Sequence, residues 1–139
     1  MAGRHDDAAA SYRQMLVLDP ENANAMNNLA YTLINTGGAA DEAQKLAEKA
    51  LQKSPRNPSF ADTLGMVYLK KNLADSALQV FGGLTQRFPD NPVFRYHYAL
   101  SLTQKGQKEK AKTELEAALL KKPPDELRKS IQSSLAKVQ

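Results

Sequence analysis

Apolar residues recur along the chain at the three- and four-residue spacing of amphipathic helices, and no segment shows the alternation expected of a strand. Residues 57–71 illustrate the pattern. Asn57–Pro58 supplies a helix N-cap followed by proline at the first helical position, and Phe60, Leu64 and Val67 then share one face. Lys71–Asn72 ends this predicted helix.

A second helix is predicted directly after the first. It runs from about residue 75 to 87, with Ala77, Phe81 and Leu84 on one face. Pro89 stops it, and Asn91–Pro92 then opens the next helix in the same way as Asn57–Pro58. The unit of this chain is therefore a pair of helices rather than a single one.

This unit repeats with a period of 34 residues. Prolines stand at positions 20, 55, 89 and 123, alanines at 8, 43, 77 and 111, and a further column holds Gly3, Gly38, Asn72 and Gly106. In each column the first step is 35 residues and the next two are 34. The columns place one inserted residue between Ala30 and Ala43, in the turn over residues 37–40, where insertions are best tolerated.

The repeat resembles the tetratricopeptide family, whose pattern is W-x₂-L-G-x₂-Y…A-x₃-F…P. The third unit departs from it only at the tryptophan, and its matching residues are Leu64, Gly65, Tyr68, Ala77, Phe81 and Pro89. The resemblance implies an all-α fold: a right-handed α-solenoid of helix-turn-helix repeats with a C-terminal capping helix. It also implies that residues 1–139 form a single domain.

Within that domain the period predicts five segments. A half repeat over 3–22 holds only the second helix of a pair, from about residue 5 to 18, and complete repeats follow over 23–57, 58–91 and 92–124. The capping helix is predicted at 125–139. Its apolar residues form one stripe, Leu127, Ile131, Leu135 and Val138, and polar residues cover the other faces, as in solenoid caps.

The half repeat leaves Ala9, Tyr12 and Leu16 without the helix that would normally cover them. One interpretation is that the chain is a piece of a longer repeat protein and that Met1 is not its natural start. The other interpretation is a natural start whose bare face makes a homo-oligomer contact through this first helix.

The composition argues against several classes of function. There is no Cys, and two His residues are too few to suggest a metal site. A balance of 19 basic against 15 acidic residues is too weak to suggest nucleic acid, and no apolar run is long enough to span a membrane. No nucleophile elbow, phosphate-binding loop or carboxylate–histidine set is visible. We therefore expect a protein that is not an enzyme and needs no cofactor.

In tetratricopeptide arrays the first helix of each repeat lines a concave groove, and family members often bind a peptide or helix there. By this resemblance the peptide-binding groove is expected to hold twelve residues: Asn24, Asn27, Asn28, Tyr31, Asn35, Asp62, Thr63, Met66, Lys70, Tyr96, His97 and Leu100. Amide side chains can bond a peptide backbone, and the apolar members can hold side-chain anchors.

The four asparagines of the groove, Asn24, Asn27, Asn28 and Asn35, lie on one helical face although Asn is a poor helix former. They mark either a binding surface or a merely solvated face, and the sequence leaves both open. The Lys/Asn/Arg clamp with which some family members grip a chaperone's C-terminal carboxylate is not matched. Only Asn28 agrees, so that function is not expected.

The sequence thus predicts a protein–protein interaction scaffold that binds a partner's peptide or helix in the groove. The alternative is a structural self-assembly module that oligomerises through the bare first helix or the convex face. The strings at 27–31 and 62–65 resemble bacterial tetratricopeptide proteins, some of which belong to envelope polysaccharide-export complexes. The compartment, cytoplasmic or periplasmic, and the partner's identity stay open.

Overall fold

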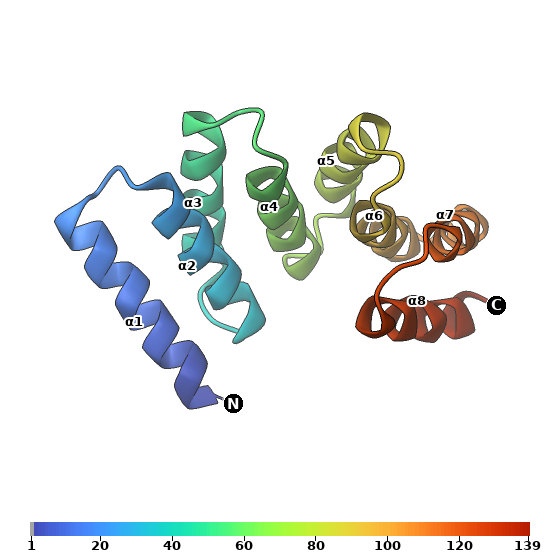
Figure 1. Cartoon of the computed structure of the whole chain (residues 1–139), viewed down its shortest axis with the longest axis horizontal. Helices are drawn as coiled ribbons and strands as arrows, with labels where there is room; N and C mark the ends of the chain where they lie inside the picture. The colour runs from blue at the N-terminus through green and yellow to red at the C-terminus, as the bar shows by residue number, and fades with distance from the viewer. Residues whose placement is uncertain (1) are drawn as a thin grey trace. The chain divides into compact units, whose positions relative to one another are not determined.

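A computed structural model describes the backbone of residues 2–139 and the side chains of residues 6–139; Met1 and the burial of residues 2–5, which include Gly3 and His5, lie outside the described part. The described chain is all-helical (Figure 1). The helices are α1 (Ala2–Leu18), α2 (Ala23–Asn35), α3 (Ala40–Lys53), α4 (Pro58–Lys70), α5 (Ala74–Arg87), α6 (Pro92–Gln104), α7 (Lys108–Leu120) and α8 (Asp125–Val138). The all-α repeat fold predicted from the sequence is confirmed.

The helix starts follow from the local sequence. The side chain of Asn57 accepts a hydrogen bond from the Phe60 backbone N–H at 3.1 Å, and Asn22 and Asn91 cap α2 and α6 in the same way. Each cap satisfies a backbone donor that has no partner inside the helix. The first helix of each complete repeat therefore starts where the Asn stands, as the sequence predicts.

The turns between the paired helices explain the inserted residue. Three residues separate α4 from α5 and α6 from α7, whereas four residues, 36–39, separate α2 from α3. Left-handed backbone at the matching position is adopted by Gly37, Asn72 and Gly106. The column that pairs Gly38 with Asn72 and Gly106 is therefore wrong by one position, because the extra residue comes after this left-handed residue.

Gly38 has a different reason to be glycine. A Cβ on this residue would lie 3.2 Å from the Leu33 carbonyl oxygen and 3.3 Å from a Leu33 methyl carbon. The backbone N–H of Gly38 donates to that same carbonyl at 2.8 Å and so closes the end of α2.

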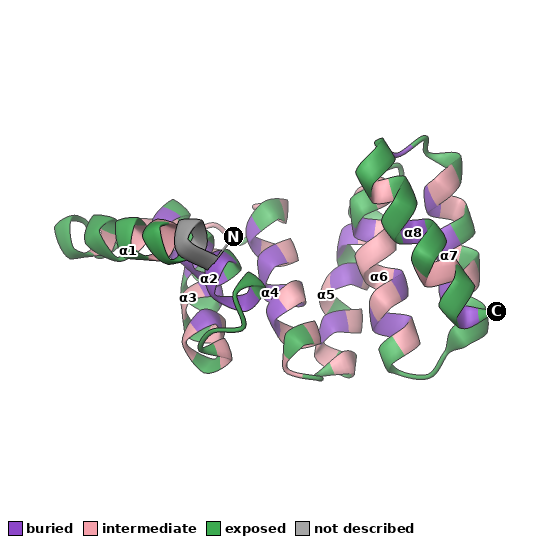
Figure 2. Ribbon diagram, turned by 90° about the horizontal axis from the view of Figure 1, so that it is seen from below, coloured by how far each residue is buried: buried purple, intermediate pink, exposed green. Residues whose placement is uncertain are grey.

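The chain divides into two compact units, one ending at Lys71 and one comprising Asn72–Gln139. In the first unit α2 packs against α1, α3 and α4. Figure 2 shows buried stretches on α2, α3 and α4. The core holds Leu29, Ala30 and Leu33 of α2 against Ala43 and Ala47 of α3, with Leu64 and Val67 of α4. Alanines at the contact let the helices approach closely while the large side chains fill the space beside them.

The second unit repeats this arrangement with its own core. Here α6 packs against α5, α7 and α8. Ala99 and Leu102 of α6 meet Ala111, Leu115 and Ala118 of α7. The helix predicted to be a cap, α8, covers α7 with Ile131 and Val138, both buried, while Gln132, Ser133 and Lys137 stay exposed. That the two units form a single repeat domain stays a prediction.

Ion pairs between neighbouring helices recur with the period. Lys71 Nζ lies 2.7 Å from Asp41, and 34 residues later Lys105 Nζ lies 2.8 Å from Asp75. Because these carboxylates are largely exposed, such pairs add little to stability. They are a consequence of the repeated sequence and do not determine the fold.

Replacing an N-cap tests the local basis of the repeat. We expect Asn57→Ala to lower the free energy of unfolding by about 1 kcal/mol, because the Phe60 N–H loses its acceptor. Urea denaturation followed by circular dichroism measures this. An unchanged unfolding midpoint would contradict the capping role.

Two glycine substitutions are expected to act in opposite directions. Gly83 lies inside α5 with nothing within 4 Å of an added Cβ, so Gly83→Ala should raise the free energy of unfolding by about 0.5–1 kcal/mol. Gly106 has φ +87°, which L-residues rarely adopt, so Gly106→Ala should lower it by about 1–2 kcal/mol. Thermal unfolding of both variants and of the wild type measures the two changes in stability. Shifts of the same sign would contradict the roles assigned to the two glycines.

Candidate functional site

The residues predicted to line a groove lie on the first helix of each complete repeat. Those on α2 and α4 belong to the first unit, where the two helices pack against each other. Those on α6, namely Tyr96, His97 and Leu100, belong to the second unit. The name A-helix surface is used below for the α2 and α4 members.

On α2 the asparagines differ sharply in exposure. Asn24, Asn28 and Asn35 are exposed, and Tyr31 is 52% exposed, which is high for a large aromatic side chain. Asn27 is only 7% exposed, and its carbonyl oxygen is buried with no hydrogen-bond partner among the described residues. A buried polar atom without a partner is unfavourable, and native structures hold few of them.

On α4 the predicted members divide into packed and accessible side chains. Thr63 is buried, and its hydroxyl donates to the Ser59 carbonyl oxygen at 3.1 Å, so its polar atom is satisfied within the helix. Met66 is half-buried against the core of the first unit. Asp62 is half-buried and Lys70 exposed. The A-helix surface is thus amide-rich, with a tyrosine ring and a methionine side chain as its apolar members.

On α6 the predicted residues lie among aromatic rings. The His97 ring centroid lies 5.3 Å from that of Phe81 and 5.7 Å from that of Tyr96. Tyr96 packs against the core of the second unit, and Leu100 is half-buried. Ring packing of this kind is the ordinary environment of a structural histidine. Among the described residues, no group of His, Cys, Asp and Glu side chains could hold a metal ion.

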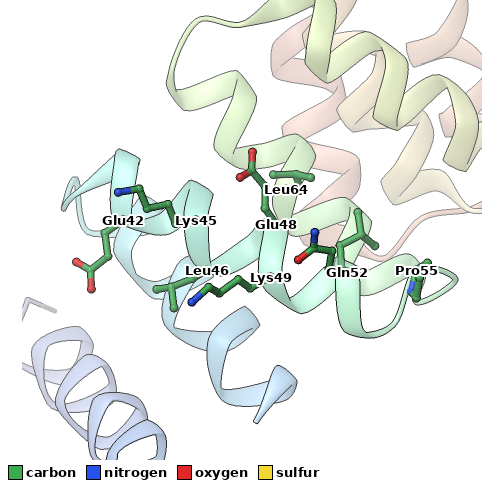
Figure 3. A pocket seen from close by; sticks show the side chains of 9 residues that line it. Glu42, Lys45, Leu46, Glu48, Lys49, Gln52, Pro55 and Leu64 are labelled. Carbon is green, nitrogen blue, oxygen red and sulfur yellow. The ribbon is translucent and has the colours of Figure 1, made fainter. Parts of the chain in front are cut away.

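A pocket of about 780 Å³ lies away from the predicted groove, on the second helix of the first complete repeat (Figure 3). Leu46 and Leu51 of α3 and Leu64 of α4 supply apolar walls, and Glu42, Lys45, Glu48 and Lys49 supply charges of both signs. None of the twelve predicted residues lines it. In the sequence, this pocket is marked only by the leucines of the second helix. Their helical spacing is also that of core residues, so the period does not distinguish leucines that line a pocket from leucines that are buried.

Comparison with known proteins agrees with this geometry. The profile of the tetratricopeptide repeat family matches residues 1–122. The chain belongs to the tetratricopeptide repeat family. This confirms the resemblance inferred from the sequence, and members of the family generally mediate protein–protein interactions and are non-catalytic scaffolds.

Individual relatives support the same assignment. A TPR repeat-containing protein of Pseudomonas aeruginosa is 35% identical over 82 residues, which are 58% of this chain and 14% of that protein. The chain therefore spans a small part of this relative's length. The crystal structure of a thermophilic TPR protein of Thermus thermophilus matches 98% of this chain and 73% of its own, at 22% identity and a TM-score of 0.83.

A tetratricopeptide repeat protein from Parabacteroides merdae also shares the fold. Its crystal structure covers 95% of this chain and 53% of its own at 17% identity, with a TM-score of 0.80. At these identities the structures establish the fold and leave the ligand open. No helix in the described part of this tetratricopeptide chain is long and apolar enough to cross a membrane.

A cross-helix ion pair ties the first helix of this tetratricopeptide chain to the first complete repeat. The guanidinium of Arg13 on α1 donates to both carboxylate oxygens of Glu42 on α3, one of them at 3.2 Å. These hydrogen bonds lower the pKa of Glu42 below its ordinary value, although partial burial acts in the opposite direction. The bidentate geometry makes this a better-defined pair than most surface contacts.

The lowered pKa gives the pair a testable pH dependence. A carboxyl group whose pKa is lower in the folded state stabilises the fold above its unfolded pKa and loses this contribution as pH falls through the folded pKa. Both side chains are more than a third exposed, so Arg13→Gln should lower the free energy of unfolding by only about 0.2–1 kcal/mol at pH 7. The difference from wild type should shrink below pH 4.

Urea titrations from pH 7 to pH 3 measure this difference. Lys129→Gln is the matched control, because it removes the same charge from an exposed position that has no ion pair within the described chain. A difference for Arg13→Gln that stays constant across this range would contradict the assignment to Glu42.

Proposed function

We propose that this chain is a protein-interaction module whose A-helix surface binds a peptide or helix of a partner protein. The residues assigned to the contact in the first unit are Asn24, Asn27, Asn28, Tyr31, Asn35, Asp62, Thr63, Met66 and Lys70. In the second unit Tyr96, His97 and Leu100 are assigned to the same role on α6. Membership of a family that generally mediates protein interactions supports a role in binding a partner protein.

The side chain of Asn27 is the observation that supports the choice of this surface. It is more than nine-tenths buried, yet its carbonyl oxygen has no partner among the described residues. Exposed Asn24, Asn28 and Tyr31 lie within about one helical turn of it on α2. The exposed amides of Asn24 and Asn28 could bond the backbone of a bound peptide directly, and a turn of the buried Asn27 amide toward the surface would give its oxygen a peptide N–H as donor.

The apolar residues of the proposed contact determine how tightly a partner peptide could bind. On the A-helix surface, Tyr31 and Met66 would contribute about 1.5–3 kcal/mol each as anchors, before the cost of ordering the partner. Micromolar binding needs about 8 kcal/mol net. Binding by this chain alone is therefore expected to be micromolar or weaker.

Panning a random dodecapeptide phage library against the immobilised chain tests the proposal. Peptides recovered on wild type should bind at least tenfold more weakly to Tyr31→Glu, because a charge replaces the exposed ring at the centre of the surface. They should bind at least threefold more weakly to Asn27→Ala. Fluorescence anisotropy of labelled peptides gives both ratios.

Asn57→Ala is the matched control for Asn27→Ala. The same truncation at the N-cap should lower stability but leave peptide affinity unchanged, at a temperature where both variants are folded. Asn27→Ala loses no hydrogen bond of that oxygen, so its effect on stability comes from the packing of the buried amide alone. Recovered peptides that bind wild type and both Tyr31→Glu and Asn27→Ala equally would contradict the proposal.

Self-assembly through the first helix is the second candidate. It is supported by Met15 and Leu18, which are 42% and 79% exposed on α1. Sedimentation velocity separates the two candidates, because a self-assembly module shows a concentration-dependent mass whereas a peptide-binding module stays monomeric without its ligand. A role in a bacterial envelope complex rests on sequence resemblance alone.

A further inference from the structure

The pocket on α3 takes no part in the proposed peptide contact. Its volume of about 780 Å³ lies within the range of small-molecule sites, which is about 300–1,000 Å³. Four residues supply its apolar walls: Leu46, Leu51, Pro55 and Leu64 (Figure 3). The pocket therefore has the size and the apolar surface that a small molecule needs.

The two leucines of α3 in this wall are held in place by the core of the first unit. Leu46 and Leu51 are both half-buried, and they pack against the cluster of Met26, Ala50 and Phe60. The surface that they still expose lines the pocket. Because this wall is already formed, an apolar group that binds there removes the surface from water without first ordering the leucines.

The two carboxylates of the lining already have partners. Glu42 is bonded by the Arg13 guanidinium. Glu48 accepts a hydrogen bond from the side-chain amide of Gln44 at 2.8 Å. The acidic residues of the pocket are therefore engaged within the chain.

The two lysines of the lining have no such partner. Lys45 and Lys49 lie one turn apart on the exposed side of α3, and Gln52 continues the same stripe. Within the part of the chain that the structure describes, neither ammonium group takes part in an ion pair. The pocket thus combines apolar walls with positively charged hydrogen-bond donors.

A smaller hollow of about 340 Å³ adjoins the pocket and shares Lys49 and Gln52 with it. The other residues that line this hollow, Glu21 and Lys53, form an ion pair with each other. One acidic and two basic residues give its lining a net charge of +1, and the unpaired charge is that of Lys49. An apolar hollow therefore lies beside a positively charged one.

The two lysines are a property of this repeat alone. The next two repeats hold uncharged residues at the matching positions, Gln79 and Thr113 for Lys45, and Gly83 and Ala117 for Lys49. The packing of the repeat therefore does not require a positive charge at either position.

We propose that the pocket on α3 and the smaller hollow form one binding site for an amphiphile, namely a long-chain carboxylate. The alkyl chain would lie against the leucines, and the carboxylate would accept hydrogen bonds from Lys49 and Gln52. A cationic head group fits poorly, because the carboxylates of the pocket are already bonded. This site is separate from the A-helix surface and does not depend on the proposed peptide contact.

Dodecanoate serves as the probe, below the concentration at which it forms micelles. Its affinity for the folded 139-residue chain is measured at pH 7 by isothermal titration calorimetry. Dodecyltrimethylammonium, with the same chain and a cationic head, is the control for charge, and octanoate is the control for chain length. Wild type should bind dodecanoate at least tenfold more tightly than either control, since each fully buried CH₂ group strengthens binding about fourfold.

A charge reversal tests the position of the head group. Lys49→Glu should weaken dodecanoate binding at least tenfold and bring the affinities for dodecanoate and dodecyltrimethylammonium within threefold of each other. Lys110→Glu on α7 is the matched control and should change neither affinity. Lys110 is likewise exposed and forms no ion pair within the described chain.

A second pair of variants tests the position of the alkyl chain. Leu51→Gln should weaken dodecanoate binding at least fivefold. Leu119→Gln is its matched control, because Leu119 is a half-buried leucine at the same position of the repeat, and it should leave the affinity unchanged. Circular dichroism at the temperature of the titration establishes that each variant is folded.

Absence of dodecanoate binding, equal affinity for dodecyltrimethylammonium, or equal losses on Leu51→Gln and Leu119→Gln would overturn the proposal. Binding of the chain to phosphatidylglycerol vesicles without binding of free dodecanoate would overturn it in favour of a membrane surface. Tyr31→Glu should leave the dodecanoate affinity unchanged, so failure of this proposal can be told apart from failure of the proposed peptide contact. A loss on Tyr31→Glu as large as that on Lys49→Glu would contradict the assignment to α3.

Discussion

Close approach of paired helices through small residues is the constraint on which the rest of this structure depends. Ala30 meets Ala43 and Ala47 in the first unit, and Ala99 meets Ala111 and Ala118 in the second. A larger side chain in these columns would separate the helices and open a cavity beside the leucines that now fill the space, and both changes are unfavourable in a close-packed interior. The contact is therefore the same in the two units, between α2 and α3 and between α6 and α7.

The same constraint decides which surfaces remain for binding. In each unit one first helix buries small and large apolar residues against its second helix, Leu29 and Ala30 on α2 and Ala99 and Leu102 on α6, so exposed polar residues are left to the other faces. Asn27 lies at the boundary between these two zones, buried like a core residue and polar like a surface one. The proposed ligand contact therefore adjoins the core, and the helices that form the core also hold the contact residues in place.

Most of the fold could be predicted from the sequence, because its signals are local and repeated. Asn57 and Asn91 mark helix starts by their own capping chemistry, and the stripe from Leu127 to Val138 predicts α8 over the residues that form it. The sequence column that contains Asn72 and Gly106 includes Gly38, whereas in the structure the matching left-handed residue is Gly37. A glycine in the sequence does not by itself reveal its backbone conformation, so the sequence could not show this shift of one position. The burial of Asn27 and the pocket on α3 depend on packing between helices, and periodicity does not determine that packing.

The central claim is that the A-helix surface of the first unit contacts a partner peptide. The most direct test is the map of amide chemical-shift changes when a peptide recovered by panning is titrated into the ¹⁵N-labelled chain. We expect the largest changes to include the side-chain amide of Asn27 and the backbone of Asn28, Tyr31 and Met66. Changes confined to α3 around Leu46 and Lys49, with none on α2, would contradict it.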